Sequence, residues 1–442
     1  MLNSIQLAGL IVISLLLLLQ LRFASKRGRP VLWLITLVFF VYFVYSGGIK
    51  LDWHIREWSH NFDVSEHYLT VATWLAVLIV IAVRCGYSIL QMAKTAGTGH
   101  VVVAYNQILV LNLIGFAALA LVFYARGGVL AVWSRTASDR VPWGGLVDGL
   151  TQMSLVYPLF TYYYIEELTI LRLAVCGIIL VIYAAFALVS GVSNDHVVRL
   201  TPFLLIWLIR HKLNLRRALV VLAVGFALVS ALRFSRQLGA TVYLGGGLSE
   251  AYTEYTDPDN PLNAVNSFGE LVVFSKIVEV VDRHTDWQFG RTYLAPLVSL
   301  IPGVLLPNKT EMLSWARVDA FMPLYYGYSD ALWTSGFYGE AYLNFGLPGL
   351  IVVSLVFGWL IRRAEVLLRS GGSVSWLPHW WVGCLLTAAL INAIRSDAGS
   401  GFMCFVGPIG LAIVFGQVMS LLLPYGPVRA LEVARRERAA AA

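Results

Sequence analysis

The stretch GEAYLNFG, residues 339–346, leads from a long polar loop into an apolar helix. The loop, from about residue 235 to residue 338, interrupts an otherwise almost continuous series of apolar segments. A glutamate, a tyrosine and an asparagine therefore lie where a membrane span would meet water. Polar groups at that depth are costly unless they face a protein interior or a wet cavity. This boundary is where we expect the chemistry of the protein.

Composition identifies the broad class. Hydrophobic residues make up 58% of the 442 residues, charged residues make up 13%, and the mean hydropathy is +0.73. Soluble domains have about 45–50% apolar and about 25% charged residues. The sequence therefore predicts an all-α, polytopic integral membrane protein. The net charge of +7 resides mostly in short loops between apolar segments, which argues against a nucleic-acid partner.

A bilayer core of about 30 Å needs about 20 apolar residues per helix, and this rule predicts about eleven spans. The first lacks a preceding basic region and a small-residue cleavage site, so we expect a retained helix rather than a signal peptide. The predicted spans are 4–22, 31–49, 69–91, 102–124, 147–165, 170–190, 197–210, 218–235, 341–361, 377–394 and 402–423.

Cations gather in alternate short loops, and with eleven spans all of these loops fall on one side. Cytoplasmic loops carry an excess of Lys and Arg, so the predicted topology has the N-terminus outside and the C-terminus in the cytoplasm. The expected regions are a bundle of about eight spans at 1–235, an extracytoplasmic loop at 236–340, about three spans at 341–423 and a cytoplasmic tail at 424–442. The cations are Arg22, Lys26, Arg27, Arg29, Lys94, Arg172, Arg210, Lys212, Arg216, Arg217, Arg362, Arg363, Arg369, Arg429, Arg435, Arg436 and Arg438.

A second group of cations is expected on the outer face, where the charge rule disfavours them. Charge pairing with the acids Glu250, Glu270, Asp319 and Asp397 is the alternative explanation for any one of these cations. Together they predict a basic pocket for a lipid-linked phosphate, because the arginine fork binds phosphate oxygens in pairs. The candidate pyrophosphate-binding residues are Arg199, Arg233, Arg291, Arg395 and Lys309.

The loop before the ninth predicted span is rich in aromatic and amide side chains. An interfacial aromatic belt has the same composition. Sugars are also bound by aromatic faces with amide and carboxylate hydrogen bonds, so the stretch predicts a glycan-binding surface. Its candidate residues are Tyr325, Tyr328, Asp330, Trp333, Tyr342 and Asn344.

Several common chemistries have no motif in this sequence. There is no phosphate-binding glycine loop, no HExxH and no Cys or His group with metal-ligand spacing, so we expect neither a metal nor a cofactor. His284 is the lone histidine of the long loop, and a single histidine is more often a hydrogen-bonded surface group than a base. Without a soluble nucleotide-binding domain, a lipid-linked donor fits better than a nucleotide sugar.

Short phrases in the C-terminal half, roughly 193–402, resemble the bacterial oligosaccharide repeat-unit polymerases (Wzy-type, O-antigen polymerase-like). The phrases lie around Arg199, at FGRTY (289–293), at IPG (301–303) with LPNK (306–309), at GEAYLNFGLPG (339–349) and at RSD (395–397). Their order and spacing carry the likeness. One departure is Gly303, where the family often has arginine.

The resemblance implies a metal-independent glycosyltransferase with a GT-C-like membrane fold. Such an enzyme transfers a growing glycan from undecaprenyl pyrophosphate to a lipid-linked repeat unit at the outer face of the inner membrane. A flippase and a chain-length regulator are the expected partners, besides membrane lipid. Glu340 is the candidate for orienting or deprotonating the acceptor hydroxyl, with His284 as the second candidate. The alternatives are an O-antigen ligase-type enzyme, and a transporter or non-enzymatic polysaccharide export component.

Overall fold

The structure, a computed structural model, describes residues 4–49, 65–89, 105–133, 150–164, 169–190, 193–257, 270–283, 286–301, 305–306, 336–370, 373–374, 377–395 and 398–422. The described residues are predominantly helical, with one short antiparallel hairpin in which β1 (Ser373–Val374) pairs with β2 (Leu377–Pro378). This confirms the predicted all-α class.

Six of the described helices are long and apolar enough to cross a membrane. They are α1 (Ser4–Lys26), α4 (Glu66–Ile89), α5 (Tyr105–Ala125), α9 (Ile170–Ser190), α11 (Leu215–Tyr243) and α17 (Gly336–Arg369). The other α-helices of eight or more residues in the described ranges are α2 (Pro30–Phe39), α8 (Val156–Tyr163), α10 (Ser193–Arg210), α12 (Leu248–Thr256), α13 (Glu270–Arg283), α14 (Arg291–Leu300), α18 (His379–Arg395) and α19 (Ala398–Leu422). The short or irregular ones are the π-helix η1 (Phe40–Ile49), α6 (Val129–Trp133) and the 3-10 turn η3 (Gln152–Leu155).

The predicted eleven crossings are matched in part. The segment expected at 147–165 appears as the short elements η3 and α8, and the expected span at 31–49 is divided between α2 and η1. α17 begins at Gly336, five residues before the predicted start, so Glu340 lies inside the helix and not ahead of it.

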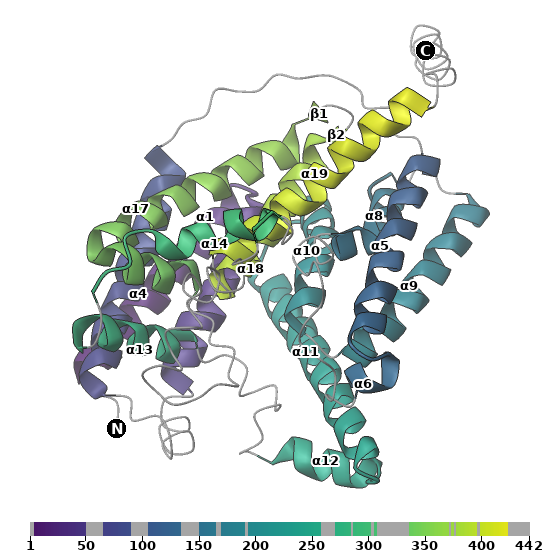
Figure 1. Ribbon diagram of the computed structural model, residues 1–442. Coiled ribbons are helices and arrows are strands. Elements are labelled where there is room, and N and C mark those ends of the chain that lie inside the picture. Colours follow the sequence, from purple (N-terminus) through teal and green to yellow (C-terminus); the bar gives the residue numbers. More distant parts are fainter. Residues whose placement is uncertain are drawn as a thin grey trace, which may run out of the picture.

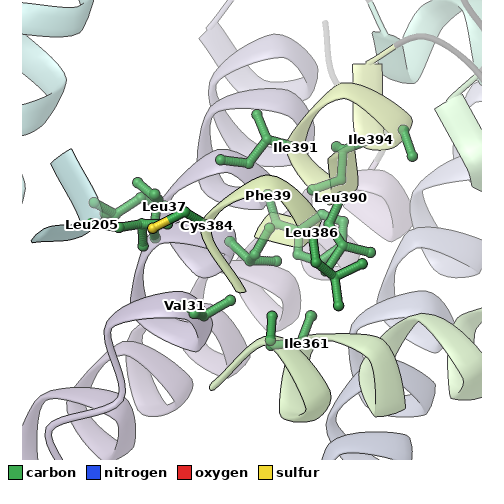
Figure 2. Packing of buried hydrophobic residues seen from close by; sticks show 14 of the residues in the cluster. Val31, Leu37, Phe39, Leu205, Ile361, Cys384, Leu386, Leu390, Ile391 and Ile394 are labelled. Carbon is green, nitrogen blue, oxygen red and sulfur yellow. The ribbon is translucent and has the colours of Figure 1, made fainter. Parts of the chain in front are cut away.

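The helices form two groups joined through α10 and α18 (Figure 1). α4 packs along α1, α13 and α17 in one group, while α5, α8 and α9 pack together in the other. α18 lies against both α17 and α10. At this junction Val31, Leu205, Ile361 and Cys384, from α2, α10, α17 and α18, belong to one cluster of buried hydrophobic side chains (Figure 2). The core thus connects the first tenth of the chain with its last fifth.

A buried carboxylate fastens α17 to the beginning of α2. Glu365 is 0% exposed, and its Oε1 accepts hydrogen bonds from the backbone amides of Val31 at 2.5 Å and Leu32 at 3.3 Å. The first amides of a helix have no acceptor within the helix. Glu365 therefore caps α2 from a distant part of the chain. Arg369, one turn later, lies 3.7 Å from Glu365 Oε2 and donates to the carbonyl oxygen of Gly28.

Cation-rich segments meet at one end of the molecule. The contact of Arg369 with Gly28 joins the loop after α1 to the end of α17. Arg210, at the end of α10, donates to the carbonyl oxygen of Tyr163 at 2.7 Å. The Tyr163 ring stacks on Trp380, at the start of α18, with centroids 3.9 Å apart. Since α18 follows α17 through the β1–β2 hairpin, three of the predicted cytoplasmic clusters lie at the same end.

Candidate functional site

Two segments that are far apart in the sequence meet at a break in α17. Gly346 has φ 60° and ψ −148°, which interrupts the helix. The backbone amide of Gln288 donates to the carbonyl oxygen of Leu343 at 3.0 Å, and that of Phe289 donates to Asn344 at 2.9 Å. The carbonyls left without partners by the break thus gain donors from the segment before α14. These are the FGRTY and GEAYLNFG stretches, so the structure brings the two together.

Gly346 is required at the break for two reasons. Its positive φ disfavours any residue with a Cβ, and a Cβ there would lie 2.8 Å from the Trp287 ring. We expect Gly346→Ala to lower the free energy of unfolding by about 1–3 kcal/mol, measured by denaturant unfolding in detergent. Gly177→Ala is the matched control, because nothing lies within 4 Å of its Cβ position in α9. Equal stability of the two variants would contradict the requirement.

A buried hydrogen-bond network lies one turn before the break. Thr292 Oγ1 donates to Glu340 Oε1 at 2.6 Å, and Asn344 Nδ2 donates to Thr292 Oγ1 at 2.6 Å. Glu340 and Thr292 are each 2% exposed, and Asn344 is 0% exposed. A carboxylate at such depth is costly unless hydrogen bonds compensate it. Thr292 supplies one of these bonds and fixes the position of the carboxylate.

The amide of Asn344 has a defined orientation. Its Nδ2 donates both to Thr292 Oγ1 and to the carbonyl oxygen of Glu340 at 2.8 Å, so its Oδ1 faces away from both. Within the described residues, Asn344 Oδ1 and the Tyr293 hydroxyl are buried without a hydrogen-bond partner. Burial, with a further contribution from Glu340, raises the pKa of Tyr293 above its usual range. Tyr293 is therefore a neutral hydroxyl, and the network holds an acceptor and a hydroxyl that a bound hydroxylated ligand would satisfy.

Tyr342 faces a second polar group, on α13. Its ring contacts Phe274 edge-on, with centroids 6.2 Å apart, and Asp282 and Tyr68 influence its hydroxyl electrostatically. Tyr68 donates to Asp282 Oδ2 at 2.5 Å, and Arg283 Nε donates to the Tyr68 hydroxyl at 3.1 Å. Tyr68, Asp282 and Arg283 thus join α4 to α13, and the contact of Phe274 with Tyr342 joins α13 to α17, the helix that carries Glu340.

The candidate cations occupy several places. Arg291 is exposed at the start of α14, one residue before Thr292. Arg395 ends α18, where a Cβ at Gly336 would lie 2.5 Å from the carbonyl oxygen of Ile394, so this end contacts the beginning of α17. Arg233 is half-buried in α11. No described interaction joins these three to a common ligand position, and their convergence stays a prediction.

Arg199, the fourth candidate cation among the described residues, has a buried position. It is buried in α10 and donates through Nη2 to Thr151 Oγ1 at 2.8 Å. Beside it is a cavity of about 20 Å³, lined by residues of η3, α8, α10, α18 and α19. A space of this size holds about one water molecule.

The remaining predicted positions lie outside the described residues. They are His284, Lys309, Tyr325, Tyr328, Asp330 and Trp333. Sequence reasoning selected Glu340 and Asn344 and missed Thr292, their hydrogen-bond partner, and Tyr293, whose ring stacks on Phe345. The FGRTY phrase was the available signal, but nothing in its spacing shows which side chain faces α17. No group of three or more His, Cys, Asp or Glu side chains in the described ranges forms a potential metal site.

Comparisons with known proteins give no match. No protein-family model, no curated protein and no solved structure matches this chain.

Proposed function

We propose that this chain is a membrane-embedded, metal-independent glycosyltransferase of the bacterial inner membrane. It would polymerise glycans by transfer from undecaprenyl pyrophosphate onto a lipid-linked repeat unit at the outer face. The observation that carries the proposal is the buried network of Glu340, Thr292 and Asn344. It joins two of the phrases on which the resemblance rests, 289–293 and 339–349. Ionisable groups buried in membrane-spanning helices are rare and mark functional sites.

The proposed reaction uses the carboxylate as a proton acceptor. The acceptor hydroxyl oxygen attacks the anomeric carbon of the donor, and the bond from that carbon to the pyrophosphate oxygen breaks. The lipid pyrophosphate leaves with the bonding electrons, while the hydroxyl proton passes to Glu340. Cations stabilise the negative charge that grows on the leaving group. Arg291 and Arg395 suit this role because α14 and α18 both contact α17, the helix that bears Glu340.

The reaction is tested with purified protein in proteoliposomes. The substrate is a repeat unit linked to undecaprenyl pyrophosphate, supplied without nucleotide sugars or divalent metal. A ladder of products that grow by one repeat unit is the expected result. Transfer of a single glycan to a lipid A core acceptor, with no ladder, would replace the proposal by a ligase. Movement of the intact substrate across the bilayer without new glycosidic bonds would replace it by a transporter.

The proposal places the Glu340 end of α17 outside and the cation-rich end in the cytoplasm. α11 tests this orientation, because Lys212 precedes it and Ser249 follows it. We expect an impermeant maleimide to label Ser249→Cys but not Lys212→Cys in intact spheroplasts, in a chain whose four native cysteines are replaced by alanine. Permeabilised cells, in which both positions should react, are the control. The opposite labelling pattern would place the site on the cytoplasmic side.

A further inference from the structure

Five large apolar side chains are exposed beside the Glu340 network. They are Trp287, Phe289, Leu294, Leu297 and Ile301, and we call them the α14 face. Phe289 is 74% exposed, Leu294 is 56% exposed and Leu297 is 53% exposed. Leu294, Leu297 and Ile301 follow one another at intervals of three and four residues, so they lie along one side of α14. Contiguous exposed apolar surfaces of this kind mark an interaction site.

The α14 face is continuous with the exposed stripe of a span-length helix. Pro348, Val352 and Val356 are exposed on α17 at intervals of four residues, which places them on one side of the helix. Since α17 is long and apolar enough to cross a membrane, hydrocarbon is the medium that this stripe would contact. The stripe meets the α14 face at the helix break, where Trp287 covers Gly346 and the Tyr293 ring stacks on Phe345 with centroids 6.2 Å apart.

The position along α17 corresponds to a membrane boundary. From Leu347 to Arg369 the helix is long enough, at about 1.5 Å per residue, to cross a hydrocarbon core of about 30 Å. The break at Gly346 then lies near the outer limit of that core. Tryptophan is enriched at this depth, and Arg291 starts the exposed side of α14 with a charge suited to lipid phosphate.

We infer that the α14 face is seated in the membrane, at the boundary between headgroups and acyl chains. Its occupant is bilayer lipid. α14 is then an interfacial helix, with its apolar side toward lipid and Thr292 on its buried side. The thickness of about one helix separates lipid from the Glu340 network. A reactant carried on a lipid would therefore approach this network sideways, from the membrane, without first entering water.

Spin labels on the α14 face test the inference. Leu294→Cys and Leu297→Cys are labelled with a nitroxide in a chain without its native cysteines, and the protein is reconstituted in liposomes. Oxygen concentrates in the hydrocarbon, while a neutral nickel chelate stays in water. We expect both labels to collide with oxygen several-fold more often than with the chelate. Val352→Cys, on the α17 stripe, is the lipid control, and Ser249→Cys, exposed on α12, is the water control.

Two results would overturn the inference. If the labels at 294 and 297 have the same ratio of oxygen to chelate collisions as the label at 249, the face lies in water. Labels reached by neither reagent would show that protein covers it, either a second copy or another part of the chain. If one variant does not reach wild-type abundance, Phe289→Cys on the same face replaces it. These outcomes do not depend on the proposed reaction, since no substrate is present.

Discussion

Glu340→Gln is expected to lower the rate of glycan polymerisation by about 10²- to 10⁴-fold, the usual contribution of a positioned acid–base group. Glutamine keeps the shape of the side chain and can accept the hydrogen bond from Thr292, but it cannot take up a proton. The measurement is the product ladder in proteoliposomes, with single repeat units remaining on the lipid carrier. Protein abundance and unfolding temperature should stay near the wild-type values. A full ladder from this variant would remove Glu340 from the reaction.

Thr292 offers a control that separates chemistry from packing. Its hydroxyl holds the Glu340 carboxylate at 2.6 Å, so Thr292→Val removes that bond at almost constant volume. Thr292→Ser keeps the hydroxyl and loses a methyl group. If the hydroxyl positions Glu340, serine should restore polymerisation and valine should not, at matched abundance. Equal activity of both variants would limit Thr292 to packing, even if Glu340→Gln is inactive.

Glu365→Ala is expected to have the largest effect on stability. It leaves the amides of Val31 and Leu32 buried without their acceptor, and it also removes the partner of Arg369. A loss of about 2–4 kcal/mol in the free energy of unfolding follows from bonds to a buried charge. Glu365→Gln keeps an acceptor oxygen and should lose about half as much.

The measurement is denaturant unfolding of the purified protein in detergent, and Glu250→Ala is the matched control. Glu250 is an exposed acid in the first turn of α12, where its interaction with the helix dipole is worth at most about 1 kcal/mol. If Glu365→Ala and Glu250→Ala unfold at the same denaturant concentration, the cap on α2 contributes nothing.

Sequence reasoning was most successful where the signal is local. Apolar runs of span length predicted α1, α5 and α9 closely, because such runs become helices that satisfy their own backbone. Glu340 and Asn344 were selected as candidates because a carboxylate and an amide near the start of an apolar helix are energetically costly. The helix start was less well placed, because Gly336 and Gly339 are weak helix formers and do not indicate that the helix includes them.

The features that the sequence did not predict depend on side-chain contacts between distant parts of the chain. Thr292 and Glu340 are 48 residues apart, and no periodicity relates them. Lys276 and Glu279 look like a solvated pair on a helix surface, yet both are buried and joined at 2.9 Å. The apolar spacing of Leu271, Phe274, Ile277 and Val278 is typical of a helix, but it does not show that protein surrounds this helix. Arg199 is predicted to belong to a basic pocket at the bilayer surface, which stays a prediction, and its burial beside Thr151 follows from how α10 packs.

The cap supplied by Glu365 has a consequence for the biogenesis of the protein. Val31 and Leu32 are translated more than three hundred residues before their acceptor, since Val31 and Glu365 are 334 residues apart. Amides without acceptors are costly in hydrocarbon, so water or the insertion machinery must satisfy them until residue 365 has left the ribosome. A nascent chain that stops earlier keeps a polar defect near its beginning.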